Sequence, residues 1–385
     1  MKSISIISKS LKEQMRSFWV VLLSLSMGPF FIFVYFLIME SSEPHYTVLM
    51  VNNDRGVFSN NQAVNHGNNL MSFFNSDTFD IPFTVKETHD RASGIESVKN
   101  KKADALIIID GLFSQAFEKH NPSDSSLIPK VEFIGDLTNT NYLISAVWAN
   151  ELLNEYAQQT TNTRRIVEVN ETALGTSATA SGFDMMVPGI LIVSLIMLMF
   201  TASIAFVSEV ENKTIMRLKL SKLTAFEFLT GIGFVQLILG IISVILTLLT
   251  ALLLGFQYAG SLSVMILIAG LTSLSIIAFS LIIAAVTKSA NEVLVVGNFP
   301  MFLFMFFTGA AFPLKSEALF SIADYPMNIQ GLLTPTHAIS ALNKTLIMNM
   351  DLSSIVPEIL SIVVLTLIYF FIGGLIFKHR HLRMS

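Results

Sequence analysis

The residues that could carry catalytic or nucleotide chemistry are few, and none stands at the spacing that such chemistry needs. The chain has no cysteine, so it can form neither disulfides nor thiolate zinc sites nor a cysteine nucleophile. Its 7 histidines are scattered without an HExxH pattern, and it has neither a GxSxG nucleophile turn nor a GxxxxGK(S/T) phosphate loop. We therefore predict no catalytic residue, no metal site and no cofactor. Any nucleotide must be hydrolysed by another chain.

The composition is that of an integral membrane protein rather than a soluble enzyme. Hydrophobic residues fill 52% of the 385 positions and charged residues only 14%, whereas about 25% of a typical soluble domain is charged. Several segments lack Asp, Glu, Lys and Arg and are long enough to cross about 30 Å of hydrocarbon. They are residues 18–39, 185–208, 228–287, 293–314 and 359–377.

Segment 228–287 is too long for a single span, because a helix of that length would reach about 90 Å. It contains the sequence GFQYAGS at 255–261, whose glycines and polar residues suit a turn at the membrane surface. We therefore predict a membrane α-helical fold with six transmembrane helices. The first covers 18–39, and the other five lie within 184–377.

The basic residues outside the spans are distributed as six spans require. By the positive-inside rule, clusters of Lys and Arg mark the cytoplasmic side. With six spans, every cluster falls on one side: Lys2, Lys9, Lys12, Arg16, Lys213, Arg217, Lys219, Lys222, Lys288, Lys378, Arg380 and Arg383. This distribution predicts that both termini are cytoplasmic, including the tail 378–385, and that the long segment between the first two spans lies outside.

That segment, residues 40–183, is predicted to be an α/β extracytoplasmic domain with a tether, inserted between helices one and two. Residues 39–183 carry 10 basic and 18 acidic residues, whereas the rest of the chain carries 14 and 10. Apolar patterns predict strands near 46–51, 83–85, 105–109 and 131–134, and helices near 60–75, 90–101, 112–119 and 139–163. Their alternation predicts a partly parallel sheet. Asp54, in a polar turn, is expected to be a turn residue rather than an acid catalyst.

Two predicted cytoplasmic segments are candidates for contact with a partner. In residues 1–17, Ile4, Ile7, Leu11 and Met15 are spaced to share one helical face, which predicts an amphipathic helix on the membrane surface. A plain basic flank is the alternative. Residues 209–227 form the main internal cytoplasmic loop, and the residues alone favour a solvated loop over a docking helix.

Residues 314–357 lie outside the membrane in this topology but are unusually apolar. Pro313, Pro326 and Pro335 divide this region into short pieces. Irregular backbone at membrane depth must be buried in protein, so we predict a re-entrant helical pair that closes the outer end of a pathway, with a surface loop as the alternative. His337 is expected to make a helix-terminal hydrogen bond rather than to carry protons.

The order of these segments resembles that of ABC type-2 exporter permeases, particularly the bacterial group that exports drugs, sodium or envelope compounds. Three stretches carry the resemblance. They are VLMVNNDRG at 48–56 with KKADALIII at 101–109 and GLF at 111–113; EVENKTIMRL at 209–218; and FTGAAFPL at 307–314 with LTPTHA at 333–338. The second stretch departs from the family pattern at Lys213, where the family has glycine.

The resemblance implies a role for each of the last two stretches. Residues expected to couple the chain to an ATPase are Glu209, Glu211, Lys213, Thr214, Arg217 and Leu218. Residues expected to form an outer re-entrant gate are Gly309, Phe312, Pro313, Pro335 and His337. With the resemblance, a docking helix in the 209–227 loop becomes the favoured interpretation.

The resemblance also implies a function and partners. The chain is expected to be the permease subunit of an ATP-binding-cassette exporter in the inner membrane, moving a small or amphipathic molecule out of the cytoplasm or the inner leaflet. Expected partners are an ATPase subunit, a second permease (a copy or a paralogue) and membrane lipid, but no nucleic acid. The alternative is a non-transport envelope protein whose outer domain binds a partner or phage.

Overall fold

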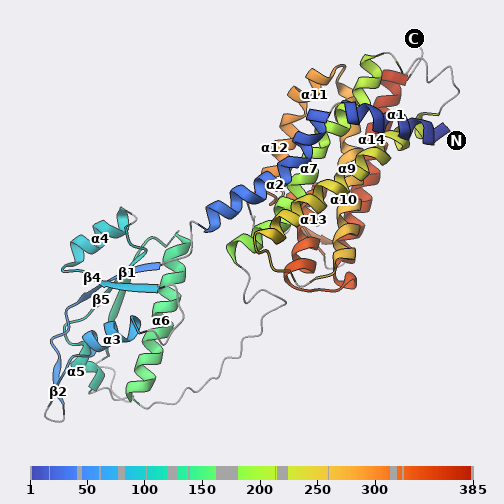
Figure 1. Ribbon diagram of the computed structural model, residues 1–385. Helices are drawn as coiled ribbons and strands as arrows, with labels where there is room; N and C mark the ends of the chain where they lie inside the picture. Colours follow the sequence, from blue (N-terminus) through green and yellow to red (C-terminus); the bar gives the residue numbers. More distant parts are fainter. Residues whose placement is uncertain are drawn as a thin grey trace. The chain divides into compact units, whose positions relative to one another are not determined.

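A computed structural model describes residues 2–16, 18–40, 46–59, 62–76, 83–100, 102–118, 128–137, 139–161, 181–212, 214, 224–258, 260–312, 319–322 and 325–382. The chain folds as two compact units (Figure 1). One unit comprises Met1–Ser41 and Thr172–Ser385, and the other comprises Ser42–Glu171.

The first unit is mainly helical. Among its described residues, 6 helical segments are long and apolar enough to cross a membrane, which confirms the predicted number and the break after residue 254. The helices are α2 (Phe18–Glu40), α7 (Gly182–Glu211), α9 (Ala225–Leu253), α10 (Leu262–Val286), the pair α11 (Ala290–Val296) and α12 (Asn298–Phe307), and α14 (Val356–Phe377).

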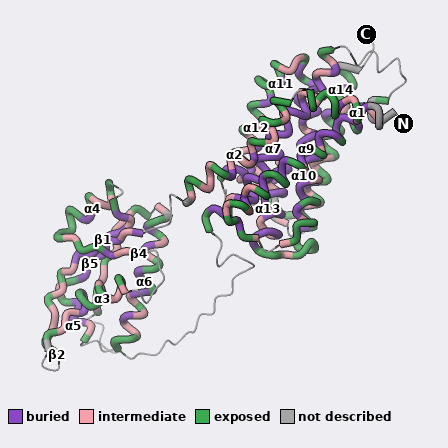
Figure 2. Tube along the Cα trace, in the orientation of Figure 1, coloured by how far each residue is buried: buried purple, intermediate pink, exposed green. Residues whose placement is uncertain are grey.

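Helix α7 is the buried centre of this unit. Of the 18 most apolar consecutive residues of α7, 83% are buried. The corresponding buried fraction is 11% in α2 and 17% in the segment that contains α14. Figure 2 shows this contrast between buried and exposed helices. Residues 187–199 of α7 are apolar on almost every side, as a fully enclosed helix requires. The surrounding helices keep apolar outer faces that suit contact with lipid.

The fifth span is interrupted at Gly297, between α11 and α12. Pro300 has no N–H group, so it cannot donate the hydrogen bond that would continue the helix back to the carbonyl of Val296. The break therefore lies just before Asn298 and Pro300.

The segment between α12 and α14 differs from the predicted helical pair. Its described residues form one α-helix, together with a β-hairpin and short turns of other helix types. These are β7 (Phe320–Ile322), β8 (Tyr325–Met327), η1 (Ile329–Leu332), α13 (Thr334–Leu342), η2 (Asn343–Ile347) and η3 (Leu352–Ile355). The predicted helix boundary at Pro335 is correct, because proline fits the first helical turn, where its missing N–H is not needed. Pro326 instead lies in a short hairpin strand.

The second unit is built on a four-stranded sheet with the order β4-β1-β5-β6. Strand β1 (Tyr46–Asn52) is parallel to β4 (Phe83–Glu87) and to β5 (Ala105–Ile109), whereas β6 (Val131–Ile134) is antiparallel to β5. These bounds confirm the four predicted strands and the partly parallel sheet. Every residue of β5 is buried, because helices cover both faces of the sheet.

The helices of this unit lie close to their predicted positions, with one correction. They are α3 (His66–Phe74), α4 (Arg91–Lys99), α5 (Phe113–Glu118) and α6 (Thr140–Thr161). Helices α3, α5 and α6 pack on one face of the sheet and α4 on the other. The predicted helix over 60–75 is wrong at its start, because a hairpin of β2 (Val57–Ser59) and β3 (Gln62–Val64) precedes α3. The side chain of Asn65 caps the helix that follows.

Asp54 organises the polar turn after β1. Its carboxylate accepts hydrogen bonds from the backbone N–H groups of Gly56 and Gly67 at 3.2 Å and of Ser114 at 3.0 Å, and a short one from the Ser114 hydroxyl. Burial opposes ionisation, but these bonds outweigh it and lower the pKa of Asp54. Because Gly67 and Ser114 lie in the first turns of α3 and α5, Asp54 fixes two helix starts, which makes it a structural turn residue as predicted.

Candidate functional site

The short helix α1 (Lys2–Arg16) lies across one end of the helical bundle. Ile6 and Ser10 are buried there, at 6% and 5% exposure. Leu11 and Met15, on the predicted apolar face, are 44% and 71% exposed. This pattern suits a helix with one side packed on the bundle and an apolar edge left for the membrane surface.

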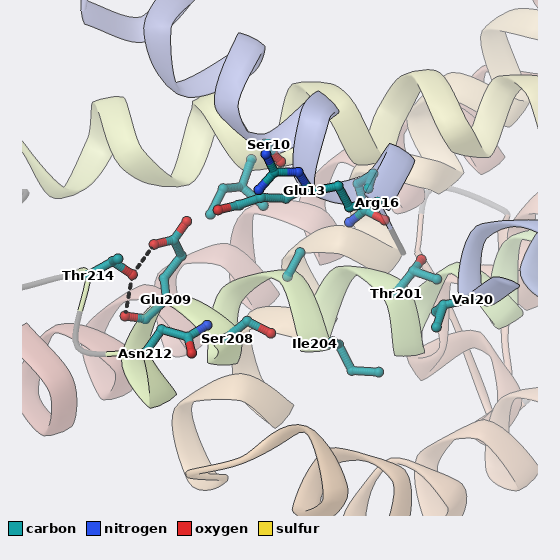
Figure 3. A pocket seen from close by; sticks show the side chains of 13 residues that line it. Ser10, Glu13, Arg16, Val20, Thr201, Ile204, Ser208, Glu209, Asn212 and Thr214 are labelled. Carbon is teal, nitrogen blue, oxygen red and sulfur yellow. Dashed lines mark hydrogen bonds between the residues drawn. The ribbon is translucent and has the colours of Figure 1, made fainter. Parts of the chain in front are cut away.

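An ionic junction joins α1 to the end of α7. The Lys9 ammonium lies 2.6 Å from Glu209 Oε1 and 3.5 Å from Glu13 Oε1. The Thr214 hydroxyl donates to the Glu209 carbonyl at 3.1 Å and makes a short bond to the Glu209 carboxylate, drawn as dashed lines in Figure 3. A carboxylate near a helix C-terminus is disfavoured by the helix dipole, so Lys9 and Thr214 compensate an otherwise unfavourable group.

The degree of burial makes this junction stronger than a surface ion pair. The Glu209 side chain is only 8% exposed, whereas that of Lys9 is 38% exposed. Glu209 therefore depends on its partners for charge compensation. Lys9 lies 200 positions away from Glu209 in the chain, so the contact joins the first helix to the end of α7.

The remaining predicted coupling residues divide into two groups. Glu211 is exposed, and its carboxylate accepts a hydrogen bond of 3.1 Å from the backbone N–H of Ala290, the first residue of α11. Lys213, Arg217 and Leu218 lie outside the described residues. The structure therefore brings Glu209, Glu211 and Thr214 to one end of α7 and gives each of them a partner within the chain.

On the opposite end of the bundle, His337 is held as a neutral ring. It is 2% exposed, with Nε2 2.7 Å from the carbonyl oxygen of Gly331 and Nδ1 3.0 Å from the Tyr325 hydroxyl. A carbonyl can only accept, so Nε2 carries the proton and Nδ1 accepts from Tyr325. Burial lowers the pKa of His337, although the Gly331 carbonyl and the Glu358 charge act against it. The bond to the turn before α13 is the helix-terminal bond that the sequence predicts.

A buried ion pair fixes the segment that follows α13. The Lys344 ammonium lies 2.6 Å from Glu358 Oε1, which also accepts a hydrogen bond of 3.1 Å from the Ser340 hydroxyl. The Glu358 side chain is 0% exposed and that of Lys344 is 31% exposed. Burial, helped by the Glu358 charge, raises the pKa of Tyr325 to about 12, so the tyrosine stays a hydrogen-bond donor.

The structure brings only some of the other predicted gate residues close together. Gly309 has φ +84°, a left-handed conformation that glycine adopts without strain. It lines a cavity of about 480 Å³ whose other wall includes Thr336 and Ser340 of α13, the helix that also carries Pro335 and His337. Phe312 is 55% exposed and stacks on Phe306 rather than lining this cavity. Pro313 lies outside the described residues.

Sequence reasoning missed one contact at these sites and one buried polar residue elsewhere in the bundle. Pairing of Lys9 with Glu209 carries no local signal, since the two residues are far apart in the chain. Gln236 of α9 did carry a signal, because an amide inside an apolar span is expensive and marks a special position. It is 0% exposed, and among the described residues neither of its amide atoms has a hydrogen-bond partner.

Comparison with known proteins is consistent with this layout. The sequence profile of the family described as "ABC-2 family transporter protein" matches residues 16–375, from the end of α1 nearly to the end of α14. No curated protein matched the chain. Within the described part of the chain, no three His, Asp or Glu residues gather as the ligands of a metal ion would.

The junction at Lys9 makes a first prediction. Replacing Lys9 with Met should lower the stability of the full chain by more than the ~1 kcal/mol of an exposed pair, but by less than the ~3–5 kcal/mol of a fully buried pair. Thermal unfolding of the purified protein in detergent measures the change. Lys9→Arg should restore most of it, and Lys12→Met, at an exposed position of the same helix, is the matched control. Equal stability of Lys9→Met and Lys12→Met would show that the junction does not hold α1.

A second prediction concerns pH. Because the pKa of His337 is lowered in the folded state, the unfolded chain binds the proton first as pH falls through about 6.5. The stability that neutral His337 contributes is therefore complete above that pH and is lost below it. Between about pH 7.5 and pH 5.5, the wild type should lose more thermal stability than His337→Gln, which cannot titrate. His379→Gln, at an exposed position of η4 (Lys378–Leu382), should behave like the wild type. If the thermal stability of the wild type and that of His337→Gln changed with pH in the same way, this assignment would be wrong.

Proposed function

Because this chain belongs to the ABC-2 transporter family, we propose that it is the permease subunit of an exporter driven by a separate ATPase subunit. The observation that carries the proposal is the ionic junction of Lys9, Glu209 and Thr214. It lies where α7 passes into the EVENKTIMRL stretch. The absence of a phosphate loop from the sequence supports a separate ATPase.

The proposed orientation follows from the charges of the chain. Both termini and the 209–227 loop face the cytoplasm, because the Lys and Arg clusters lie there. The α/β unit and the segment with α13 then face outward, and the chain resides in the inner membrane of the cell. The proposed domain bounds are 1–17 for the amphipathic helix, 40–183 for the outer domain with its tether, and 378–385 for the tail.

We assign the coupling between ATP hydrolysis by the partner and movement of the proposed gate to α7 and to the contacts at its two ends. An ATPase that docks on the 209–227 loop would push on Thr214 and Glu209, and the Lys9 contact would carry the displacement into α1. Because α7 is enclosed by the other helices, it can move only together with its neighbours. Interfaces between packed helices switch between discrete arrangements rather than deforming smoothly. The proposed gate beside Gly309 and α13 responds at the other end.

The exposed faces of the bundle fit a dimer in a membrane. Four phenylalanines of α12 present large apolar surfaces, with exposures of 76%, 52%, 42% and 59% for Phe299, Phe302, Phe306 and Phe307. We assign this face to lipid or to a second permease, which is either a copy or a paralogue of this chain. The cargo is a small or amphipathic molecule from the cytoplasm or the inner leaflet.

Topology gives the third prediction. Since the chain has no cysteine, single cysteines can be introduced without a background signal. Cysteines replacing Ser59 and Ser123 should react with a membrane-impermeant maleimide in intact cells, because the charge distribution places them outside. A cysteine replacing Ser221 should react only after permeabilisation. Labelling of Ser221→Cys in intact cells would rule out the six-span topology.

Coupling gives the fourth prediction. Arg217→Glu reverses a charge suited to a carboxylate of the ATPase, and Leu218→Asp removes an apolar anchor worth roughly 2 kcal/mol of docking energy. Both variants should reach the membrane at normal levels but lose stimulated ATP hydrolysis in complex with the ATPase. Lys288→Glu is the matched control, because Lys288 is an exposed basic residue of another cytoplasmic loop. If both loop variants still stimulated ATP hydrolysis normally, or if only their protein level fell, this loop would not be the coupling element.

A further inference from the structure

A pocket of about 300 Å³ opens between α1, α2 and α7, beside the ionic junction (Figure 3). Glu13 and Arg16 line it from α1, and Ser208 and Asn212 line it from the end of α7. Its apolar wall includes Val20 and Ile204. Ligand cavities usually measure roughly 300–1,000 Å³, so this pocket is large enough for a polar headgroup but too small for a whole lipid.

The elements around the pocket place it at headgroup depth. Helix α2 begins at Phe18, and Trp19 next to it is 78% exposed. The apolar run of α7 ends at Val207, and Ser208 and Glu209 follow. Tryptophan and amphipathic helices both concentrate at the boundary between lipid and water. That this boundary is the cytoplasmic one rests on the proposed function and its topology.

The charges around the pocket are balanced but not fully paired. One ammonium, that of Lys9, serves two carboxylates, at 2.6 Å from Glu209 and 3.5 Å from Glu13. The Glu13 side chain is 52% exposed, so it is the less neutralised of the two. Arg16 has no hydrogen-bond or ion-pair partner among the described residues. The partly neutralised carboxylate of Glu13 and the guanidinium of Arg16 thus lie three positions apart on α1.

We propose that this pocket binds a zwitterionic amine–phosphate group, supplied by the headgroup of phosphatidylethanolamine in the adjoining leaflet. The guanidinium of Arg16 offers a fork of donors to the phosphate. The carboxylate of Glu13 accepts hydrogen bonds from the ammonium, and Ser208 and Asn212 supply neutral partners at the opposite wall. The acyl chains lie along α2, where Val20 and Leu23 are 44% and 62% exposed.

This charge pattern selects against the other common headgroups. Two cations and two carboxylates leave the site without net charge, so it gives an anionic headgroup no advantage. A choline headgroup carries the same charges as ethanolamine but cannot donate hydrogen bonds to Glu13. A bound ethanolamine headgroup touches both α1 and α7 and thereby reinforces the junction at Lys9 and Glu209.

Lipid retention by the purified full chain tests this site. After delipidation in detergent, the protein is incubated with phosphatidylethanolamine, phosphatidylglycerol or phosphatidylcholine, and bound lipid is counted by native mass spectrometry. Phosphatidylethanolamine should be retained best. Glu13→Gln and Arg16→Gln should each weaken that retention roughly five-fold or more, as expected for the loss of one charge-assisted hydrogen bond. Lys12→Gln, on the same helix but outside the pocket lining, should leave it unchanged.

A competition arm distinguishes the two sources of this group. If soluble glycerophosphoethanolamine displaces the lipid, the pocket also accepts the free amine–phosphate compound; if it does not, the acyl chains are required. Either result keeps the headgroup assignment. Equal retention of all three lipids, or equal retention by Glu13→Gln, Arg16→Gln and Lys12→Gln, would overturn it. The measurement needs neither an ATPase nor transport, so its outcome is independent of whether the proposed function is correct.

Discussion

The enclosure of α7 by the other helices is the constraint on which the rest of the membrane unit depends. A helix surrounded by protein can be apolar throughout its length, but its polar ends need partners. At the start of α7, Asp184 forms a capping box with Ser181 and accepts a hydrogen bond of 3.1 Å from the backbone of Gln257, in the turn between α9 and α10. At the other end, Glu209 and Glu211 hold α1 and the start of α11. Three carboxylates of α7 thus form contacts with neighbouring elements at both ends of the helix.

The two ends of the bundle are held by ion pairs of similar burial. At the end with α13, the side chains of Glu358 and Lys344 are 0% and 31% exposed. At the other end, those of Glu209 and Lys9 are 8% and 38% exposed. The contact of Glu211 with the start of α11 differs, because Glu211 is exposed and solvent screens electrostatic contacts.

The sequence predicts the elements well because their physical causes are local. Apolar runs long enough for a bilayer located the six spans, and buried β-branched runs such as 105–109 located the strands. Where local signals conflict, the prediction is wrong: Val57–Ser59 and Gln62–Val64 pair as antiparallel strands, and α3 begins only after Asn65, whose side chain caps it. The apolar residues of the segment with β7 and β8 predict helices, although short apolar runs do not distinguish strand from helix.

The candidate site was harder to predict, because it depends on contacts between distant parts of the chain. The family motif pointed to Glu209 and Thr214, but nothing near Lys9 indicates that it meets Glu209. Likewise, Lys344 and Glu358 could each be assigned to the membrane surface, but not to a shared buried pair. Such pairs become visible only when packing brings two helices together and excludes water from between them.

The most direct test of the account is to isolate the full chain from its native membrane in mild detergent, after brief chemical cross-linking in the cell. If the chain is an exporter permease, an ATPase with a phosphate loop should accompany it in a fixed ratio. Once the two are released from the cross-link, ATP hydrolysis by that ATPase should rise when the purified chain is added back. Recovery of the intact, folded chain with no such ATPase, before or after cross-linking, would contradict the assignment as an exporter permease.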